Sequence, residues 1–194
     1  MDDELDRLAQ RVRQCRACEA ELPLGANPVI QVGRQARLLI VGQAPGIKVH
    51  HSSIPWNDPS GDRLREWLGM DKSRFYDPQQ VAIIPMGFCY PGRGQSGDLP
   101  PRKECAQLWH QQLLEQLPNI EVILLVGQYA QNYYLADKPK TLTDTVHQWQ
   151  NWAPRYFPLP HPSPRNALWL RKNPWFEEEV LPALRAQIEH LFAG

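Results

Sequence analysis

Short, continuous apolar runs alternate along this chain with segments whose apolar residues recur at helical spacing. The runs predict buried strands at 37–41, 81–86, 121–126 and 155–159. The spacing predicts helices at 3–17, 61–69, 101–117, 128–135, 141–149 and 175–192, with loops at 19–36, 43–60 and 87–100. Strands that alternate with helices are typical of a parallel sheet covered on both faces. We therefore expect an α/β fold, a three-layer α/β/α sandwich with a central four-stranded parallel sheet.

At 194 residues the chain is long enough for one sizeable core, and no repeat or low-complexity tract divides it, so we expect a single domain over 1–194. Because 21 Lys and Arg balance 21 Asp and Glu, net charge does not point to a polyanion partner, although a local basic face would still bind phosphate. No apolar run approaches the about 20 residues that span a bilayer, and the acidic start, Met1-Asp2-Asp3-Glu4, is unlike a signal peptide. A cytoplasmic protein is expected, with no membrane contact and no protein partner that can be inferred.

Two polar loops follow predicted strands and carry the strongest indication of function. Gly42-Gln43-Ala44-Pro45-Gly46 comes after the strand at 37–41, and His161-Pro162-Ser163-Pro164-Arg165-Asn166 comes after the strand at 155–159. In an open parallel sheet, ligands bind outside the carboxyl ends of the strands. We therefore expect the two loops to face one pocket.

The residue types in these loops suit the binding of a polar ligand. Glycine at position 42 lets the backbone approach a ligand closely, and the Gln43 amide can orient a water or bind a carbonyl. His161, fixed between prolines, can stabilise a developing anion, and Ser163 with Arg165 suits a nucleic-acid phosphate. Taken singly, each loop is also compatible with an ordinary strand-to-helix connection or an incidental surface histidine. The pair favours a site.

The four cysteines form two groups. Cys15 and Cys18 make a C-x2-C pair, and Cys89 and Cys105 flank a loop rich in Pro and Gly. Four thiolates can ligate a [4Fe–4S] cluster or a zinc ion. Free buried thiols are the other interpretation, and disulfides are not expected in a reducing compartment.

The two loops resemble the signature motifs of the uracil-DNA glycosylase superfamily, and the likeness covers most of the chain. The loop at 42–46 is similar to the family's water-activating loop. The loop at 161–166 is similar to its His-Pro-Ser-Pro segment, which enters the minor groove and carries a histidine facing the base. Ile54-Pro55-Trp56 followed by Ser60-Gly61-Asp62-Arg63-Leu64 is similar to a segment of the iron–sulfur type. By that match, Trp56 takes the place of the aromatic residue that stacks on the flipped base, although a core tryptophan is the alternative.

The resemblance implies hydrolysis of the N-glycosidic bond of uracil or another deaminated base in DNA, a step of base excision repair. It implies a structural [4Fe–4S] cluster held by all four cysteines, with zinc as the less favoured occupant. The expected catalytic residues are Gln43, His161 and His50. The expected substrate-binding residues are Gly42, Ala44, Trp56, Ser163 and Arg165.

Two positions depart from the iron–sulfur type. Gln43 stands where that type usually has Glu, and an amide cannot serve as a base. Pro85 stands where it usually has Asn, and proline has neither a side-chain amide nor a backbone N–H. Buried polar groups that read a base set specificity, so their loss should relax discrimination. His50 or the neighbouring His51 is expected to supply a missing group, and Asp58 is a further candidate.

Two polar residues are expected at helix starts. Asp62 is expected to belong to a helix start, and Asn166 is expected to cap the helix that follows it.

A protein that binds damaged or single-stranded DNA without cleaving it is the second functional hypothesis. An enzyme acting on a small nucleoside or nucleotide is the third.

Overall fold

Four parallel strands form the central sheet in a computed structural model that describes residues 3–193. They are β1 (Leu38–Val41), β2 (Val81–Ile83), β5 (Val122–Val126) and β6 (Tyr156–Leu159), in the order β2-β1-β5-β6. All are buried except for the partly exposed first residue of β6. Two-sided burial explains why they read as continuous apolar runs rather than alternating ones. The acidic start of the chain, Met1 and Asp2, lies outside the described residues.

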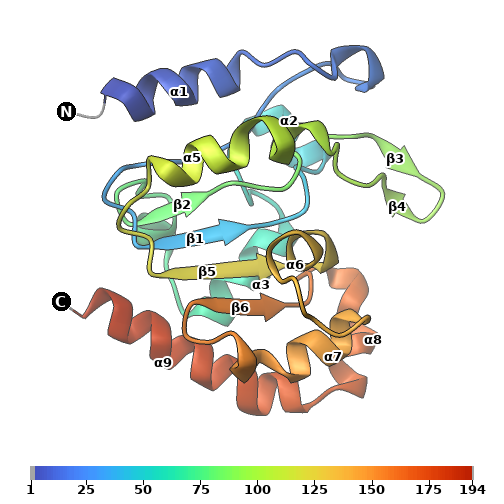
Figure 1. Ribbon diagram of the computed structural model, residues 1–194. Helices are drawn as coiled ribbons and strands as arrows, with labels where there is room; N and C mark the ends of the chain where they lie inside the picture. The colour runs from blue at the N-terminus through green and yellow to red at the C-terminus, as the bar shows by residue number, and fades with distance from the viewer. Residues whose placement is uncertain (1–2, 194) are drawn as a thin grey trace.

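Helices cover both faces of this sheet, as Figure 1 shows. On one face, Leu38 and Ile40 of β1 share a core with α3 and α9; on the other, Leu39 and Val41 share a core with α1, α5 and α6. The expected three-layer α/β/α sandwich is therefore confirmed. The helices are α1 (Asp3–Arg13), α2 (Ile47–Ser52), α3 (Pro59–Leu68), α4 (Lys72–Phe75), α5 (Gln111–Glu115), α6 (Gln128–Tyr134), α7 (Leu142–His147), α8 (Ala167–Lys172) and α9 (Leu181–Phe192).

The strand register places the two polar loops at one edge. Val41 pairs with Leu125, and Leu159 pairs with Val126, so β1 and β6 end within one residue of each other on either side of β5. All four arrows in Figure 1 point to this edge. The loops that follow β1 and β6 are therefore brought together by strand pairing alone.

Several boundaries differ from the expectation. The predicted loop 43–60 contains α2 and the start of α3, and the predicted loop 87–100 contains a hairpin of β3 (Arg93–Gly94) and β4 (Gly97–Asp98). The helix predicted at 101–117 becomes helical only at residue 104. It passes through a π-helical stretch, Ala106–His110, before it continues as α5. The strand predicted at 81–86 ends at Ile83, shortly before Pro85, which has no N–H for the ladder.

Across residues 3–193, no helix combines the length and the apolar character that crossing a membrane would require.

Candidate active site

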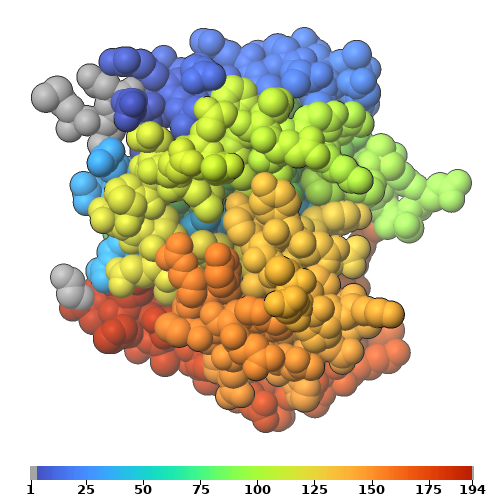
Figure 2. All heavy atoms as spheres, in the orientation of Figure 1, coloured from blue at the N-terminus to red at the C-terminus, as the bar shows by residue number. Residues whose placement is uncertain are grey.

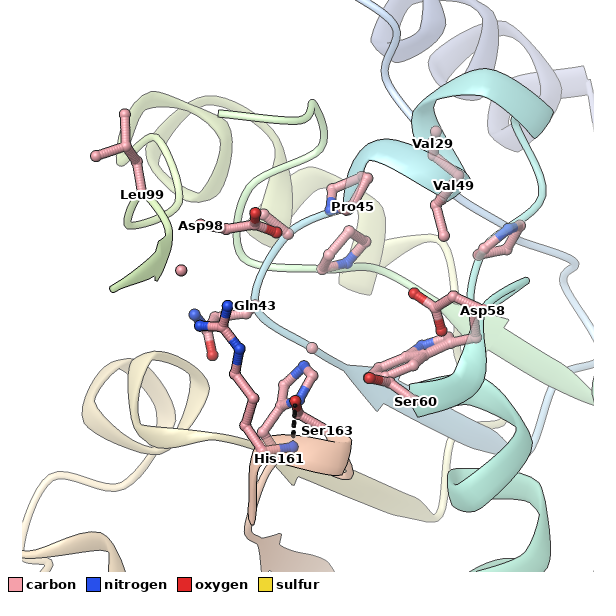
Figure 3. A pocket seen from close by; sticks show the side chains of 18 of the residues that line it. Val29, Gln43, Pro45, Val49, Asp58, Ser60, Asp98, Leu99, His161 and Ser163 are labelled. Carbon is pink, nitrogen blue, oxygen red and sulfur yellow. Dashed lines mark hydrogen bonds between the residues drawn. The ribbon is translucent and has the colours of Figure 1, made fainter. Parts of the chain in front are cut away.

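A cavity of about 510 Å³ opens at the carboxyl ends of the strands, within the size range of small-molecule sites (Figure 3). The Gly42–Gly46 loop, the β3–β4 hairpin and the loop after β6 supply much of its wall. Seven of the eight expected catalytic and substrate-binding residues line it: Gly42, Gln43, Ala44, Trp56, His161, Ser163 and Arg165. The two polar loops therefore do face one pocket.

Trp56 is held in the wall of the cavity in an unusual backbone conformation. Its φ is 58°, a left-handed value that is a genuine outlier for a bulky residue; it costs of order 1–3 kcal/mol and persists only where the surroundings impose it. Two glycines make room for it, since a Cβ on Gly61 would lie 1.7 Å from the Trp56 carbonyl oxygen and one on Gly42 would lie 2.8 Å from the indole. Arg65, buried beneath, donates a hydrogen bond from Nη1 to the same carbonyl at 3.1 Å.

His161 lies beside this indole, with 5.7 Å between the ring centroids and 34° between the planes. Burial lowers the pKa of His161 below its ordinary value, and the nearby charge of Asp58 opposes this only in part. The imidazole is therefore neutral near pH 7, so one ring nitrogen carries a proton that can be donated without a positive charge.

The loop that carries His161 is held by its own side chains. Asn166 donates from Nδ2 to the His161 carbonyl at 2.7 Å, and the Ser163 hydroxyl accepts from the Arg165 N–H at 3.2 Å. Asn166 occupies the N-cap position of α8, as expected, but its amide makes this backward contact and no capping bond. Ser163 caps the preceding 3-10 turn, Pro164–Asn166.

Gln43 and its neighbour are fixed through their backbones. The carbonyls of Gly42 and Gln43 accept the N–H groups of Met86 and Gly87, each at 2.9 Å, which ties the turn to the segment after β2. The Gln43 side chain lines the cavity, with Oε1 close to Gly127: a Cβ there would lie 3.2 Å away. An amide in this place can orient a ligand or a water, but it cannot take up a proton.

Pro85 also lines the cavity, and its carbonyl is hydrogen-bonded to His110, a residue that was not predicted from the sequence to belong to the site. His110, 1% exposed, places Nε2 2.8 Å from the Pro85 carbonyl and Nδ1 2.7 Å from the Tyr134 hydroxyl. Burial lowers the pKa of His110 to about 4. A neutral ring that donates from Nε2 and accepts at Nδ1 satisfies both partners. The sequence does not indicate this role for His110, because its two partners, Pro85 and Tyr134, lie on other segments of the chain.

Arg165 does not point freely to solvent. Its Nη1 donates to the carbonyl of Ser96 at 3.0 Å, across to the β3–β4 hairpin, and a Cβ on Gly97 would lie 2.5 Å from the same nitrogen. The next residue, Asp98, presents a carboxylate to the cavity, and a Cβ on Gly46 would lie 3.6 Å from its Oδ2. Figure 2 shows the hairpin projecting from the molecular surface. Asp98 was not predicted, since its segment was expected to be an unstructured loop.

The two aspartates near α3 have local roles. Asp58 is the N-cap of this helix, and its Oδ1 accepts the Gly61 N–H at 2.8 Å. Asp62 lies in the first turn, as expected, and pairs with Arg65 at 2.8 Å. Asp58 alone of the two also lines the cavity.

His50, expected to be catalytic, is not among the residues that line the cavity. It lies in α2, where its carbonyl accepts from Asn27 Nδ2 at 2.8 Å and its ring packs near His51 and Tyr90, with centroids 5.4 and 6.2 Å away. The structure therefore does not bring His50 together with Gln43 and His161 in the lining of this cavity.

All four cysteines are free thiols and line a second, small pocket. Burial raises the pKa of Cys18 and Cys89, and it raises the pKa of Cys105 to about 12, although the Phe88 N–H donates to its Sγ at 3.4 Å. Such thiols keep their protons unless a metal displaces them. No group of three His, Cys, Asp or Glu side chains within the described part of the chain is placed to hold a metal ion.

The chemistry of this pocket fits a thiolate-ligated group better than an apolar core. Arg102 lines it, and its Nε is buried without a hydrogen-bond partner among the described residues. The same side chain donates from Nη2 to Glu104 at 2.7 Å, so it is anchored in place. The pocket thus places four sulfurs beside a buried guanidinium nitrogen.

Fold and cavity together define an α/β/α protein whose ligand site lies where the parallel strands end. The family model of the Uracil DNA glycosylase superfamily matches residues 30–185, and the chain belongs to this superfamily. The matched region includes both polar loops, Cys89 and Cys105. It begins after Cys15 and Cys18, so the cysteine set as a whole lies outside what the match describes.

Proposed function

We propose that this protein is a DNA base-excision glycosylase, a hydrolase that cleaves the N-glycosidic bond of uracil or another deaminated base. Membership of the superfamily supports a glycosylase of this general kind. The observation that carries the proposal is the meeting of Trp56, His161 and the Gly42–Gly46 turn in one cavity.

The base has to leave the DNA stack before its glycosidic bond can be reached, at a cost of a few kcal/mol. Trp56 offers an aromatic face on which the everted base stacks. The neutral imidazole of His161 then donates an N–H to the negative charge that spreads over the departing base. A preformed donor of this kind is worth about 3 kcal/mol in the transition state.

Gln43 orients the attacking water through its amide. Ser163 and the backbone of its loop hold a phosphate near the extruded nucleotide. Arg165 contributes to the same phosphate contact with the guanidinium N–H groups that Ser96 does not use.

Selectivity among deaminated bases is proposed to be relaxed. Pro85 presents neither a side-chain amide nor an N–H to the cavity, and its carbonyl is taken by His110. A wall without a donor cannot reject a base that lacks the matching acceptor.

A structural [4Fe–4S] cluster held by Cys15, Cys18, Cys89 and Cys105 is part of the proposal. Coordination by these four residues would tie the N-terminal loop to the segment after β2. Zinc, which four thiolates can also ligate, is the less favoured occupant.

The test is a base-release screen with cluster-loaded protein. Matched single- and double-stranded oligonucleotides would carry uracil, hypoxanthine or xanthine at one position, and free base would be measured by mass spectrometry. Release from at least one lesion, with none from the undamaged strand, is expected. Release from free 2′-deoxyuridine but not from DNA would favour a nucleoside enzyme instead.

A non-catalytic DNA binder is the second candidate, favoured by one observation: the residue at the water-activating turn is an amide, not an acid. It predicts binding of lesion-containing DNA with no base released.

A protein that acts on DNA has to be in the cell compartment that contains DNA. The cytoplasmic location expected from the sequence stays a prediction.

A further inference from the structure

Cleavage of an N-glycosidic bond leaves positive charge on the sugar, which has oxocarbenium character in the transition state. A fixed negative charge beside the sugar stabilises that state, and a carboxylate can also accept a proton from the attacking water. Gln43 can do neither, because its amide is neutral. The reaction proposed above therefore lacks a carboxylate at the turn where water is expected to bind.

Two carboxylates line the cavity, Asp58 and Asp98. Asp58 is already engaged as the N-cap of α3 through the Gly61 N–H, and it lies beside His161, on the side where the base is expected to leave. In Figure 3 it lies with Ser60, across the cavity from Asp98. Its position suits the departing base rather than the attacking water.

Asp98 lies against the turn that carries Gln43. Its Oδ2 is close to Gly46, where a Cβ would come within 3.6 Å, and Figure 3 shows its carboxylate on the side of the cavity that also holds Gln43 and Pro45. In the described part of the chain, this carboxylate has no hydrogen-bond partner.

The hairpin that carries Asp98 is fixed across the cavity. Arg165 Nη1 donates to the carbonyl of Ser96 at 3.0 Å, and the guanidinium packs so closely on Gly97 that a Cβ there would lie 2.5 Å from it. Only Gly97 separates the anchored residue from Asp98 in the chain. The contact therefore sets where Asp98 stands relative to the turn.

We propose that Asp98 is the catalytic carboxylate of this site, delivered by the β3–β4 hairpin to the place where Gln43 lacks a charge, and that Arg165 is its positioning residue. This inference rests on the proposed glycosylase function.

Water attacks C1′ of the deoxyribose as the C1′–N bond breaks, and the electron pair of that bond leaves with the base. One water proton passes to Asp98, and the hydroxyl stays on C1′. The base anion, held by the His161 N–H, takes a proton from solvent, and Asp98 returns its proton to solvent.

The surroundings of Asp98 give this role a pH signature. Burial raises the pKa of Asp98 above its ordinary value, the charges of Arg165 and Arg93 oppose that rise, and Asp58 adds to it. The carboxylate has to be ionised to act, so the rate should increase with pH on the acidic side of the profile.

The experiment measures single-turnover base release from the lesion that the unmodified protein cleaves fastest. Asp98→Asn is expected to lower the rate by about 100-fold or more. Its affinity for a duplex carrying an uncleavable 2′-fluoro nucleotide at the lesion should stay unchanged or rise, because a negative charge facing DNA is removed. Asp137→Asn, at an exposed carboxylate after α6, is the matched control and should release base at the rate of the unmodified protein.

Relocating the charge gives a second readout. Gln43→Glu added to Asp98→Asn should restore base release at least tenfold, and the same change added to His161→Ala should not. Arg165→Gln should move the acidic limb of the pH profile to higher pH, because the positive charge that holds down the pKa of Asp98 is gone. A purely structural role for Arg165 would lower the rate without moving that limb.

The outcomes separate the two proposals. Unmodified protein that releases no base from any lesion overturns both. Unmodified protein that releases base while Asp98→Asn does so within threefold of its rate overturns only the assignment of Asp98. A fall in rate matched by an equal fall in affinity for the uncleavable duplex also overturns it, since that result describes a binding role.

Discussion

The ring centroids of Trp56 and His161 lie 5.7 Å apart, although the two residues come from segments far apart in the chain. β1 and β6 flank β5 and end within one residue of each other, so the segments that follow them lie at the same edge of the sheet. An aromatic face and a neutral N–H donor are thereby presented to the same cavity. This pairing is what a flat, hydrogen-bonding ligand such as a nucleobase requires.

Replacing His161 with alanine should lower base release by about 100-fold, because one preformed donor to a developing anion is worth about 3 kcal/mol. The affinity for DNA with an uncleavable lesion should change little, since the donor acts mainly in the transition state. Single-turnover kinetics and fluorescence anisotropy measure the two effects. His190→Ala, at an exposed position on α9, is the control, and equal losses of rate and affinity in His161→Ala would contradict the prediction.

Gly42→Ala should disturb ligand stacking, because the new Cβ would lie 2.8 Å from the Trp56 indole. Base stacking on an aromatic side chain is worth about 1–3 kcal/mol, so affinity for lesion-containing DNA should fall by up to that amount. In a Trp56→Ala background the same glycine change should have little further effect. A double-mutant cycle measures this coupling, and additive losses would show that Gly42 acts independently of Trp56.

Stability should depend on pH through His110. Burial lowers its folded pKa to about 4, whereas the unfolded value is about 6.5. Between these values the unfolded chain binds a proton that the folded protein does not, so the free energy of unfolding rises with pH across this window and is lost as pH falls. The slope is up to roughly 1.4 kcal/mol per pH unit.

Urea unfolding of the wild type and His110→Gln at several pH values between about 4.5 and 7.5 isolates this contribution. The glutamine variant should be less stable near pH 7 and should lose part of the pH slope. His190→Gln serves as the control, since that histidine is exposed. Identical slopes in the wild type and His110→Gln would show that another group causes the pH dependence.

Protein purified without oxygen should be brown, with broad visible absorption and bound iron and sulfide, if the four cysteines hold a cluster. Cys89→Ser should lower the iron content and the thermal midpoint, because a ligand in the segment after β2 is lost. Iron and sulfide analysis, together with thiol titration of the unfolded protein, measures this. A colourless protein with one zinc per chain, or four freely titrating thiols without metal, would contradict the prediction.

The four strands and their burial could be predicted from the sequence, because a run such as Val122–Val126 is apolar throughout and has one plausible environment. Helix ends were harder to predict from the sequence. Whether the Asn166 amide caps a helix or donates to the His161 carbonyl depends on the folded shape of the loop. Asp98 was missed because a two-residue ladder in a Gly-rich segment has no apolar pattern. His50 was expected at the site because the sequence around it does not indicate that it lies in α2, outside the lining of the cavity.

A stretch of five residues, Pro85-Met86-Gly87-Phe88-Cys89, borders both pockets. At its start the N–H groups of Met86 and Gly87 hold the carbonyls of Gly42 and Gln43, and near its end the Phe88 N–H donates to Cys105 Sγ. One short peptide therefore links the thiol pocket to the cavity. If the four cysteines hold the proposed cluster, its loss is expected to loosen the turn that carries Gln43, and base release should fall together with the iron content.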